Sequence, residues 1–119
     1  MENPLSMVKN KIVLVPFPFD NFKKFKVRPA ICLTEIFGKK EQVIIVFITS
    51  KYAEDLDSTD ILLSEKDEGF QQTGLIVKSA IKLQKIVTIP VRFIKRELGE
   101  LPAARMEELN TKLRRVFDL

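Results

Sequence analysis

Arg28 stands directly before Pro29 at the start of a β-prone segment, a placement that suits the binding of a phosphate group. Its guanidinium group is planar, permanently charged and able to donate two parallel hydrogen bonds to phosphate oxygens. Because proline holds the preceding residue in extended geometry, Arg28 loses less conformational entropy when it binds an anion. An ordinary strand-start arginine paired with a surface carboxylate is the alternative, and for a single residue it is the commoner case.

The most β-prone segment of the chain, residues 42–49, ends at Thr49 and is followed by Ser50, so two hydroxyl groups stand at its end. Such hydroxyls can contact a phosphate oxygen or orient an attacking group. The alternative is structural, because threonine is a good strand residue and serine a good turn residue.

Pairing geometry connects the arginine with these hydroxyls. The segments at residues 27–37 and 42–49 are joined by a turn near Gly38, which predicts an antiparallel hairpin. The start of the first strand and the end of the second then lie at the same end of the hairpin. We therefore expect Arg28 and Thr49 to be spatial neighbours.

A basic loop with interleaved aromatic rings precedes Arg28. It contains Phe22, Lys23, Lys24, Phe25 and Lys26. Its lysines could attract an RNA backbone while an exposed ring stacks on an unpaired base. Equally, the rings could anchor the loop to the core while the lysines keep it soluble. Lys85 could add a phosphate contact, although a solvated strand face explains it as well.

Composition limits the chemistry. The 119 residues carry a net charge of +4, which is compatible with a polyanionic partner, and they include no histidine and one cysteine, Cys32. Histidine metal ligands and histidine-dependent triads are therefore excluded, and neither a metal nor a cofactor is expected. A single cysteine forms no internal disulfide, which favours the cytoplasm. The apolar segments are too short to span a membrane, and residues 1–11 do not have the pattern of a secretory signal.

The coarse pattern predicts a mainly β protein. Strands are expected at residues 12–17, 27–37, 42–49, 60–63, 80–83 and 85–89, with a helical turn within 64–70. Apolar residues from Met106 to Phe117 share one face of a C-terminal helix. We predict one domain over residues 1–119, with a flexible segment 1–7, a small β-barrel over 8–89 and a helix over 103–118.

Several segments, taken in order, resemble the MazF/PemK family of toxin endoribonucleases. They are the run KIVLVPFPFDNFKKFKVRPAICLT from Lys11, the pair Gly74-Leu75, the run KSAIKLQKIVTI from Lys78, and IKRELGEL from Ile94 followed by a helix. The resemblance covers roughly residues 8–119. Two departures are Asn10-Lys11, where the family has Gly-Asp, and a first loop at residues 21–26 without glycine.

This resemblance implies the SH3-like, PemK-like barrel and a catalytic pair, Arg28 and Thr49. It implies a type II toxin (an mRNA interferase) that cleaves single-stranded RNA without a metal. The 2′-hydroxyl would attack the adjacent phosphorus and leave a cyclic phosphate and a 5′-hydroxyl. Expected partners are RNA, a second copy in a homodimer, and an acidic, partly disordered antitoxin. Expected RNA-binding residues are Phe22, Lys23, Lys24, Phe25, Lys26, Ser50 and Lys85.

The fold does not by itself fix this activity. The alternative is a non-catalytic barrel toxin, or a nucleic-acid-binding module, that acts through a protein partner such as gyrase.

Overall fold

The computed structural model describes residues 7–16, 26–51 and 56–119. The strands are β1 (Lys11–Pro16), β2 (Val27–Cys32), β3 (Gln42–Thr49), β4 (Asp60–Leu63), β5 (Ser79–Pro90) and β6 (Arg96–Glu100). Short 3-10 helices follow β4 and β5, at η2 (Phe70–Thr73) and η3 (Val91–Phe93). One α-helix, α1 (Ala103–Phe117), ends the chain.

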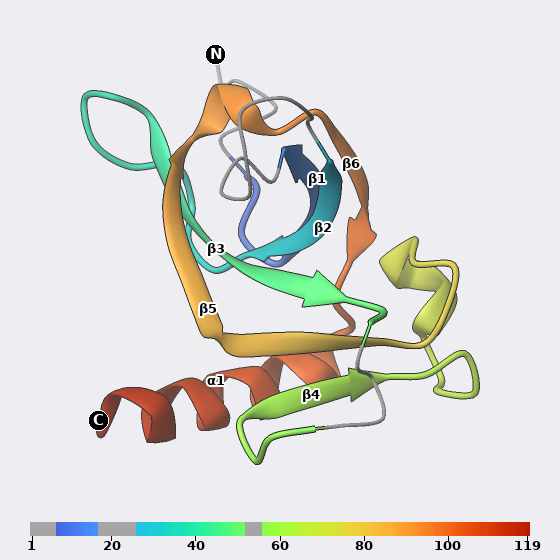
Figure 1. Cartoon of the computed structure of the whole chain (residues 1–119). Coiled ribbons are helices and arrows are strands. Elements are labelled where there is room, and N and C mark those ends of the chain that lie inside the picture. The colour runs from blue at the N-terminus through green and yellow to red at the C-terminus, as the bar shows by residue number, and fades with distance from the viewer. Residues whose placement is uncertain (1–6, 17–25, 52–55) are drawn as a thin grey trace.

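The strands form a six-stranded sheet in the order β4-β5-β3-β2-β1-β6, and every neighbouring pair is antiparallel. The sheet curls into a half-barrel, with α1 lying beside β4 and β5 (Figure 1). The expected mainly β fold with a C-terminal helix is therefore confirmed. Strands β3 and β4 begin and end as the sequence predicted, and α1 begins at the predicted residue but ends at Phe117 instead of residue 118.

Both faces of the sheet are covered, which explains why its central strand is almost continuously apolar. Along β3, Val46 and Ile48 belong to one core cluster, whereas Ile45 and Phe47 belong to the other. This alternation follows from the two-residue period of a strand. Leu109 of α1 completes the first cluster, so the helix buries its apolar face against the sheet.

Side chains of helix α1 also form hydrogen bonds with backbone carbonyl groups along the outer edge of β4. Lys112 donates a hydrogen bond to the carbonyl oxygen of Asp60 over 2.7 Å, and Arg105 donates one to the carbonyl oxygen of Leu62. Because an edge strand presents unpaired backbone groups to solvent, these two contacts occupy acceptors that another chain could otherwise use.

Strand β2 is shorter than the predicted segment 27–37, since it ends at Cys32. After it, side chains take over some of the backbone hydrogen bonds. Thr34 Oγ1 accepts from the Ile44 amide over 3.2 Å, and Glu35 Oε1 accepts from the Val8 amide over 2.7 Å. These local acceptors let the chain leave the ladder before it turns at Gly38, where φ is +78°.

Three further predictions about elements were wrong in detail. The segments 80–83 and 85–89 are one strand, β5, which continues past Gln84 while its register with β3 shifts between Val46 and Ile48. The helical turn expected within 64–70 is displaced to η2. The sheet also continues beyond residue 89, because β6 pairs with β1. None of the helices in the described part of the chain is long and apolar enough to cross a membrane.

Candidate functional site

A pocket of about 430 Å³ lies where β2 begins and β3 ends. It is lined by Leu14, Val27, Arg28, Pro29, Ile48, Thr49, Ser50, Gly74, Leu75, Ile76, Val77, Ser79, Arg96 and Leu98. Two of these described residues are arginines and none is acidic. The pocket therefore combines apolar walls, hydroxyl groups and positive charge, which is a suitable combination for an anionic group attached to an apolar body.

Arg28 reaches this pocket from a strand that is paired on both sides. Its partner in β1 is Val15, and the pairing of β2 with β3 includes Ala30 opposite Phe47. Continued by two residues, the second register sets Arg28 opposite Thr49. The side chain is half-buried and its Nε atom is shielded from solvent. Partial burial strengthens the interaction of the guanidinium charge with an anion, because the surrounding protein screens that interaction less than water does.

Thr49 also lines the pocket, and its hydroxyl is already oriented. Thr49 Oγ1 accepts a hydrogen bond from the backbone amide of Lys51 over 3.0 Å. A threonine hydroxyl that accepts in this way keeps its own hydrogen for donation. The neighbouring Ser50 is exposed and lines the same pocket. The structure thus brings Arg28, Thr49 and Ser50 together, while their roles stay predictions.

One wall of the pocket is an apolar lip that sequence analysis did not single out. Val27, Ile76 and Val77 are 53%, 88% and 48% exposed, and all three line the pocket. The backbone of the lip is held at Val77, because the hydroxyl of Ser79 donates a hydrogen bond to the carbonyl oxygen of Val77 over 2.8 Å. A fixed, exposed aliphatic surface beside two arginines offers contact area to the apolar part of a ligand.

Two glycines place this lip against β6. A Cβ atom added to Gly74 would overlap the carbonyl oxygen of Leu98, and one added to Gly99 would overlap the carbonyl oxygen of Gln72. Gly74 also has φ of +76°, a conformation that favours glycine. The backbones of the η2 turn and of β6 are therefore in direct contact, and this contact sets the position of residues 75–77.

The remaining predicted RNA-binding residues either lie outside the described part of the chain or are described but do not line the pocket. Phe22, Lys23, Lys24 and Phe25 lie outside the described residues. Lys26 is exposed directly before β2, and Lys85 is exposed on β5, but neither lines the pocket. Their contribution to binding stays a prediction.

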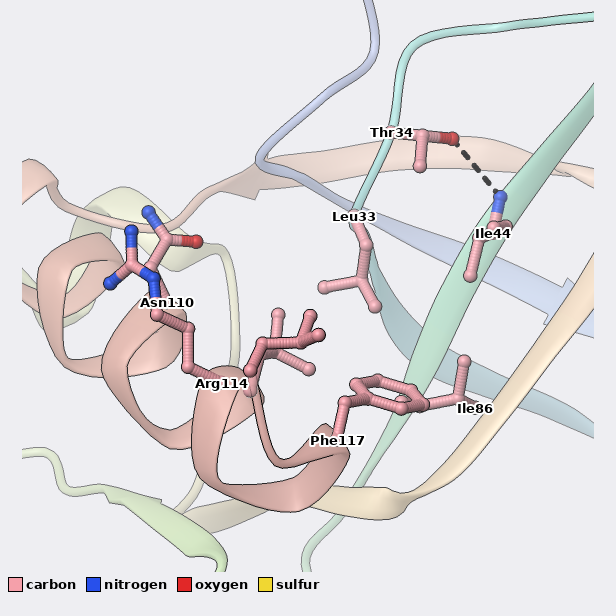
Figure 2. A pocket seen from close by; sticks show the side chains of 9 residues that line it. Leu33, Thr34, Ile44, Ile86, Asn110, Arg114 and Phe117 are labelled. Atoms are coloured by element: carbon pink, nitrogen blue, oxygen red, sulfur yellow. Dashed lines mark hydrogen bonds between the residues drawn. The ribbon is translucent and has the colours of Figure 1, made fainter.

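A second pocket, of about 390 Å³, lies at the C-terminal end of α1 (Figure 2). Its lining is mainly apolar and includes Leu33, Ile86 and Phe117, with Arg114 at its side. The hydrogen bond from the Ile44 amide to Thr34 fixes one wall. None of the described residues that were predicted to bind or cleave RNA lines this pocket, so its lining differs from that of the first pocket.

Cys32 is excluded as a nucleophile at neutral pH. The residue is fully buried, and burial, followed by the nearby charges of Glu35 and Glu97, raises the pKa of its thiol to about 12. The reactive thiolate is therefore scarce. Among residues 7–16, 26–51 and 56–119, no three His, Cys, Asp or Glu side chains are grouped so that they could hold a metal ion.

Arg96 is the residue that sequence analysis missed most clearly. It occurs there only within the run from Ile94, because the charged segment from Arg96 to Glu100 does not indicate a strand. Pairing with β1 makes this segment a strand and brings Arg96 to the pocket wall.

Comparisons with known proteins agree with this fold. The profile of one family, described as PemK-like, MazF-like toxin of type II toxin-antitoxin system, matches residues 9–117. The Mycobacterium tuberculosis toxin MazF-mt6 superposes with a TM-score of 0.69 at 22% identity, over 92% of this chain and 97% of that one. A MazE-MazF structure from Deinococcus radiodurans gives a TM-score of 0.73 at 17% identity, over 96% and 97%.

A third solved structure is an endoribonuclease from Mycobacterial species in complex with its cognate antitoxin. It gives a TM-score of 0.68 at 15% identity, over 96% of this chain and 95% of that one. At these identities the superpositions establish the fold. No curated protein matches the sequence.

Proposed function

Because this chain belongs to the PemK-like, MazF-like toxins of type II toxin-antitoxin systems, we propose that it is an endoribonuclease that cleaves single-stranded RNA without a metal ion. The observation that carries the proposal is one pocket lined by Arg28 and Thr49, with no carboxylate among its described lining residues. Cleavage in which the 2′-hydroxyl of the RNA itself attacks the phosphorus needs no activated water. Such cleavage benefits most from positive charge around the phosphate.

The proposed reaction is attack of the ribose 2′-oxygen on the adjacent phosphorus. The bond from the 2′-oxygen to phosphorus forms, and the bond from phosphorus to the 5′-oxygen breaks. The 2′-hydroxyl loses its proton to a base and the 5′-oxygen gains one. The products are a 2′,3′-cyclic phosphate and a 5′-hydroxyl, so atoms and charge balance without a cofactor.

Arg28 is assigned to stabilising the phosphate as its charge grows. A guanidinium group has too high a pKa to act as a base, but it can donate two hydrogen bonds to the non-bridging oxygens. Thr49 is assigned to a third hydrogen bond, since Lys51 occupies its acceptor side and leaves the hydroxyl hydrogen available. No described residue of the pocket can serve as a carboxylate base, so a partner subunit or the substrate would take the proton.

Binding of the rest of the RNA is assigned to the residues around the pocket. The basic loop, with Phe22, Lys23, Lys24, Phe25 and Lys26, would attract the backbone and stack on a base, and Ser50 and Lys85 would add polar contacts. The apolar lip at Ile76 and Val77 would cover one face of a base or sugar next to the cleaved bond.

The proposed partners follow from the family and from the solved complexes. One structure that shares this fold contains MazE with MazF, and another contains an endoribonuclease with its cognate antitoxin. We expect this chain to form a cytoplasmic homodimer that is inhibited by an acidic, partly disordered antitoxin, which folds as it binds.

The proposal is tested by incubating the purified protein with unstructured RNA in excess chelator. The expected result is fragmentation that leaves cyclic phosphate and 5′-hydroxyl ends, and that Arg28→Ala strongly reduces. Retention of RNA without cleavage would point to a binding module. Neither binding nor cleavage would point to a barrel toxin that acts on a protein such as gyrase.

A further inference from the structure

One face of the sheet forms an apolar floor in the first pocket. Leu14 of β1 is opposite Arg96 of β6 on one side and opposite Pro29 of β2 on the other. Continued by one residue, the register of β2 with β3 adds Ile48 to this row. Residues directly opposite each other share a face of the sheet, and all four line the pocket. The floor therefore carries three apolar side chains, with the guanidinium group of Arg96 at its β6 end.

The segment 75–78 crosses from one side of this floor to the other. It begins after Gly74, which is so close to β6 that an added Cβ would overlap the carbonyl oxygen of Leu98, and it ends where β5 starts at Ser79. In the sheet, β3, β2 and β1 lie between β5 and β6. Figure 1 shows the chain returning from the yellow η2 turn beside β6 to β5. Because Ile76 and Val77 of this segment also line the pocket, the pocket is a slot with apolar residues on two sides.

The acidic neighbours of Arg96 are directed elsewhere. Glu97 and Glu100 both pair with Lys11, over 3.5 and 3.6 Å. Successive side chains of a strand point to opposite faces, so Arg96 lies on the face of the floor while Glu97 lies on the other. The side chain of Arg96 is exposed, and no ion pair or side-chain hydrogen bond joins it to another described residue. Its donors are thus available to a ligand in the slot.

A flat ring with hydrogen-bond acceptors at its edge suits such a slot better than a phosphate does. Unpaired bases of RNA are commonly held between side chains and read at their edges, whereas a phosphate loses its water against an apolar surface. The fork of an arginine matches two adjacent acceptors. Guanine presents N7 and O6 in this way, while adenine presents N7 beside an amino donor. A slot of about 430 Å³ also has room for a two-ring base, which a single-ring cytosine would fill less well.

We propose that Arg96 selects a guanine next to the cleaved bond, by donating two hydrogen bonds to N7 and O6 of a base held in this slot. Neighbouring strands lie about 4.8 Å apart, so the backbones of β6 and β2 are roughly 10 Å apart across β1. The base and the cleaved phosphate would therefore belong to adjoining nucleotides. The inference rests on the proposed ribonuclease function and adds a base preference to it.

The first experiment locates the preference. RNA of random sequence is digested with the wild type, Arg96→Ala and Arg96→Lys, and the new ends are sequenced. The wild type should show guanine enriched at one of the two positions that flank the cleaved bond. Arg96→Ala should lose this enrichment, and Arg96→Lys should keep part of it. Arg115→Ala is the matched control and should cleave like the wild type, because it removes the same charge from an exposed position of α1 that does not line this pocket.

The second experiment identifies the atoms that are read. Oligonucleotides with one cleavable bond carry guanine, hypoxanthine, 7-deazaguanine, adenine or cytosine at the enriched position. Hypoxanthine keeps N7 and O6, so its kcat/KM with the wild type should stay close to that of guanine. The other three bases should lose about tenfold to a hundredfold, as expected for a bidentate arginine–guanine contact. Arg96→Ala should show that loss with guanine and should treat all five bases alike.

Three outcomes would overturn the inference while leaving the proposed function in place. The wild type could cleave without a guanine preference, it could accept 7-deazaguanine as well as guanine, or Arg96→Ala could keep the wild-type preference. If the wild type does not cleave RNA at all, the proposed function and the inference fail together. Thermal unfolding of each variant checks the fold, and Arg96→Gln, which keeps a long polar side chain without the fork, replaces Arg96→Ala if alanine lowers stability.

Discussion

Arg28 of β2 and Thr49 of β3 line one pocket, and each lies two residues beyond the pair Ala30 and Phe47, where the ladder between the two strands ends. One contributes a permanent positive charge and the other a hydroxyl whose acceptor side is occupied by the Lys51 amide. The pair thus offers several hydrogen-bond donors to a single anionic group, and it does so from the ends of two ladder-bonded strands. Such rigid support keeps donors aligned without reorganisation during a reaction.

Replacing Arg28 by alanine should lower the rate of RNA cleavage by about a hundredfold or more, because it removes a donor that acts on the developing charge of the phosphate. Single-turnover cleavage of a short unstructured RNA measures the effect. Arg28→Lys should recover part of the rate, since it keeps the charge and loses the bidentate geometry. A folded Arg28→Ala protein that cleaves at the wild-type rate would remove this residue from the mechanism.

Replacing Thr49 by valine should lower the cleavage rate by about tenfold to a hundredfold, because valine has a similar shape and no hydroxyl to donate. Thr49→Ser is the matched control and should stay close to the wild type. Both variants should bind RNA with similar affinity if the hydroxyl acts mainly in the transition state. Equal loss in the serine and valine variants would show that the shape of the side chain matters more than its hydroxyl.

Replacing Gly99 by alanine should destabilise the protein by about 2 kcal/mol or more, because the added methyl group would overlap the backbone of Gln72 and Thr73. Gly38→Ala is the control for conformational strain alone. Gly38 has φ of +78° and open space around it, so its substitution should cost only about 1 kcal/mol. Urea unfolding measures both values, and a smaller loss for Gly99→Ala than for Gly38→Ala would contradict the tight contact of β6 with η2.

The free energy of unfolding should fall as the pH rises above about 9, through the titration of Cys32. Burial raises the pKa of this thiol from 9.0 to about 12 in the native protein. Between these values the unfolded chain loses the proton and the native protein keeps it, so deprotonation favours the unfolded state. The contribution of Cys32 is complete below pH 9 and is lost as the pH approaches 12.

The comparison with Cys32→Ala isolates this effect, because the lysines and Tyr52 titrate in the same range in both proteins. The wild type should lose more stability than Cys32→Ala between pH 8 and pH 11, on the order of a few kcal/mol. In the same way, a thiol reagent should label the native protein slowly and the urea-unfolded protein at once. Rapid labelling of the native protein at neutral pH would show that the thiol is accessible.

The elements that the sequence predicted well are those with a strong local pattern. Strands β3 and β4 are dense in β-branched or aliphatic residues, and α1 repeats its apolar residues with a helical period, so their predicted bounds agree with the structure to within one residue. Strand β6 has no such pattern, since its five residues include three charged ones and a glycine. It is a strand because β1 offers it an unpaired edge, and no feature within residues 96–100 could reveal that.

The same division applies to the pocket. The meeting of Arg28 and Thr49 at one pocket follows from a hairpin between consecutive strands, and such a hairpin is a local consequence of the turn at Gly38. Arg96, the apolar lip at Ile76 and Val77, and the glycine contacts that hold the lip come from segments that meet only after the sheet curls and β6 closes against β1.

By itself, the sequence determined the class of fold, the central hairpin and the residues at its end, because these depend on periodicity and on neighbours close in the chain. The tertiary structure alone decided which distant residues complete the pocket, because long-range strand pairing is set by burial and hydrogen bonding over the whole sheet.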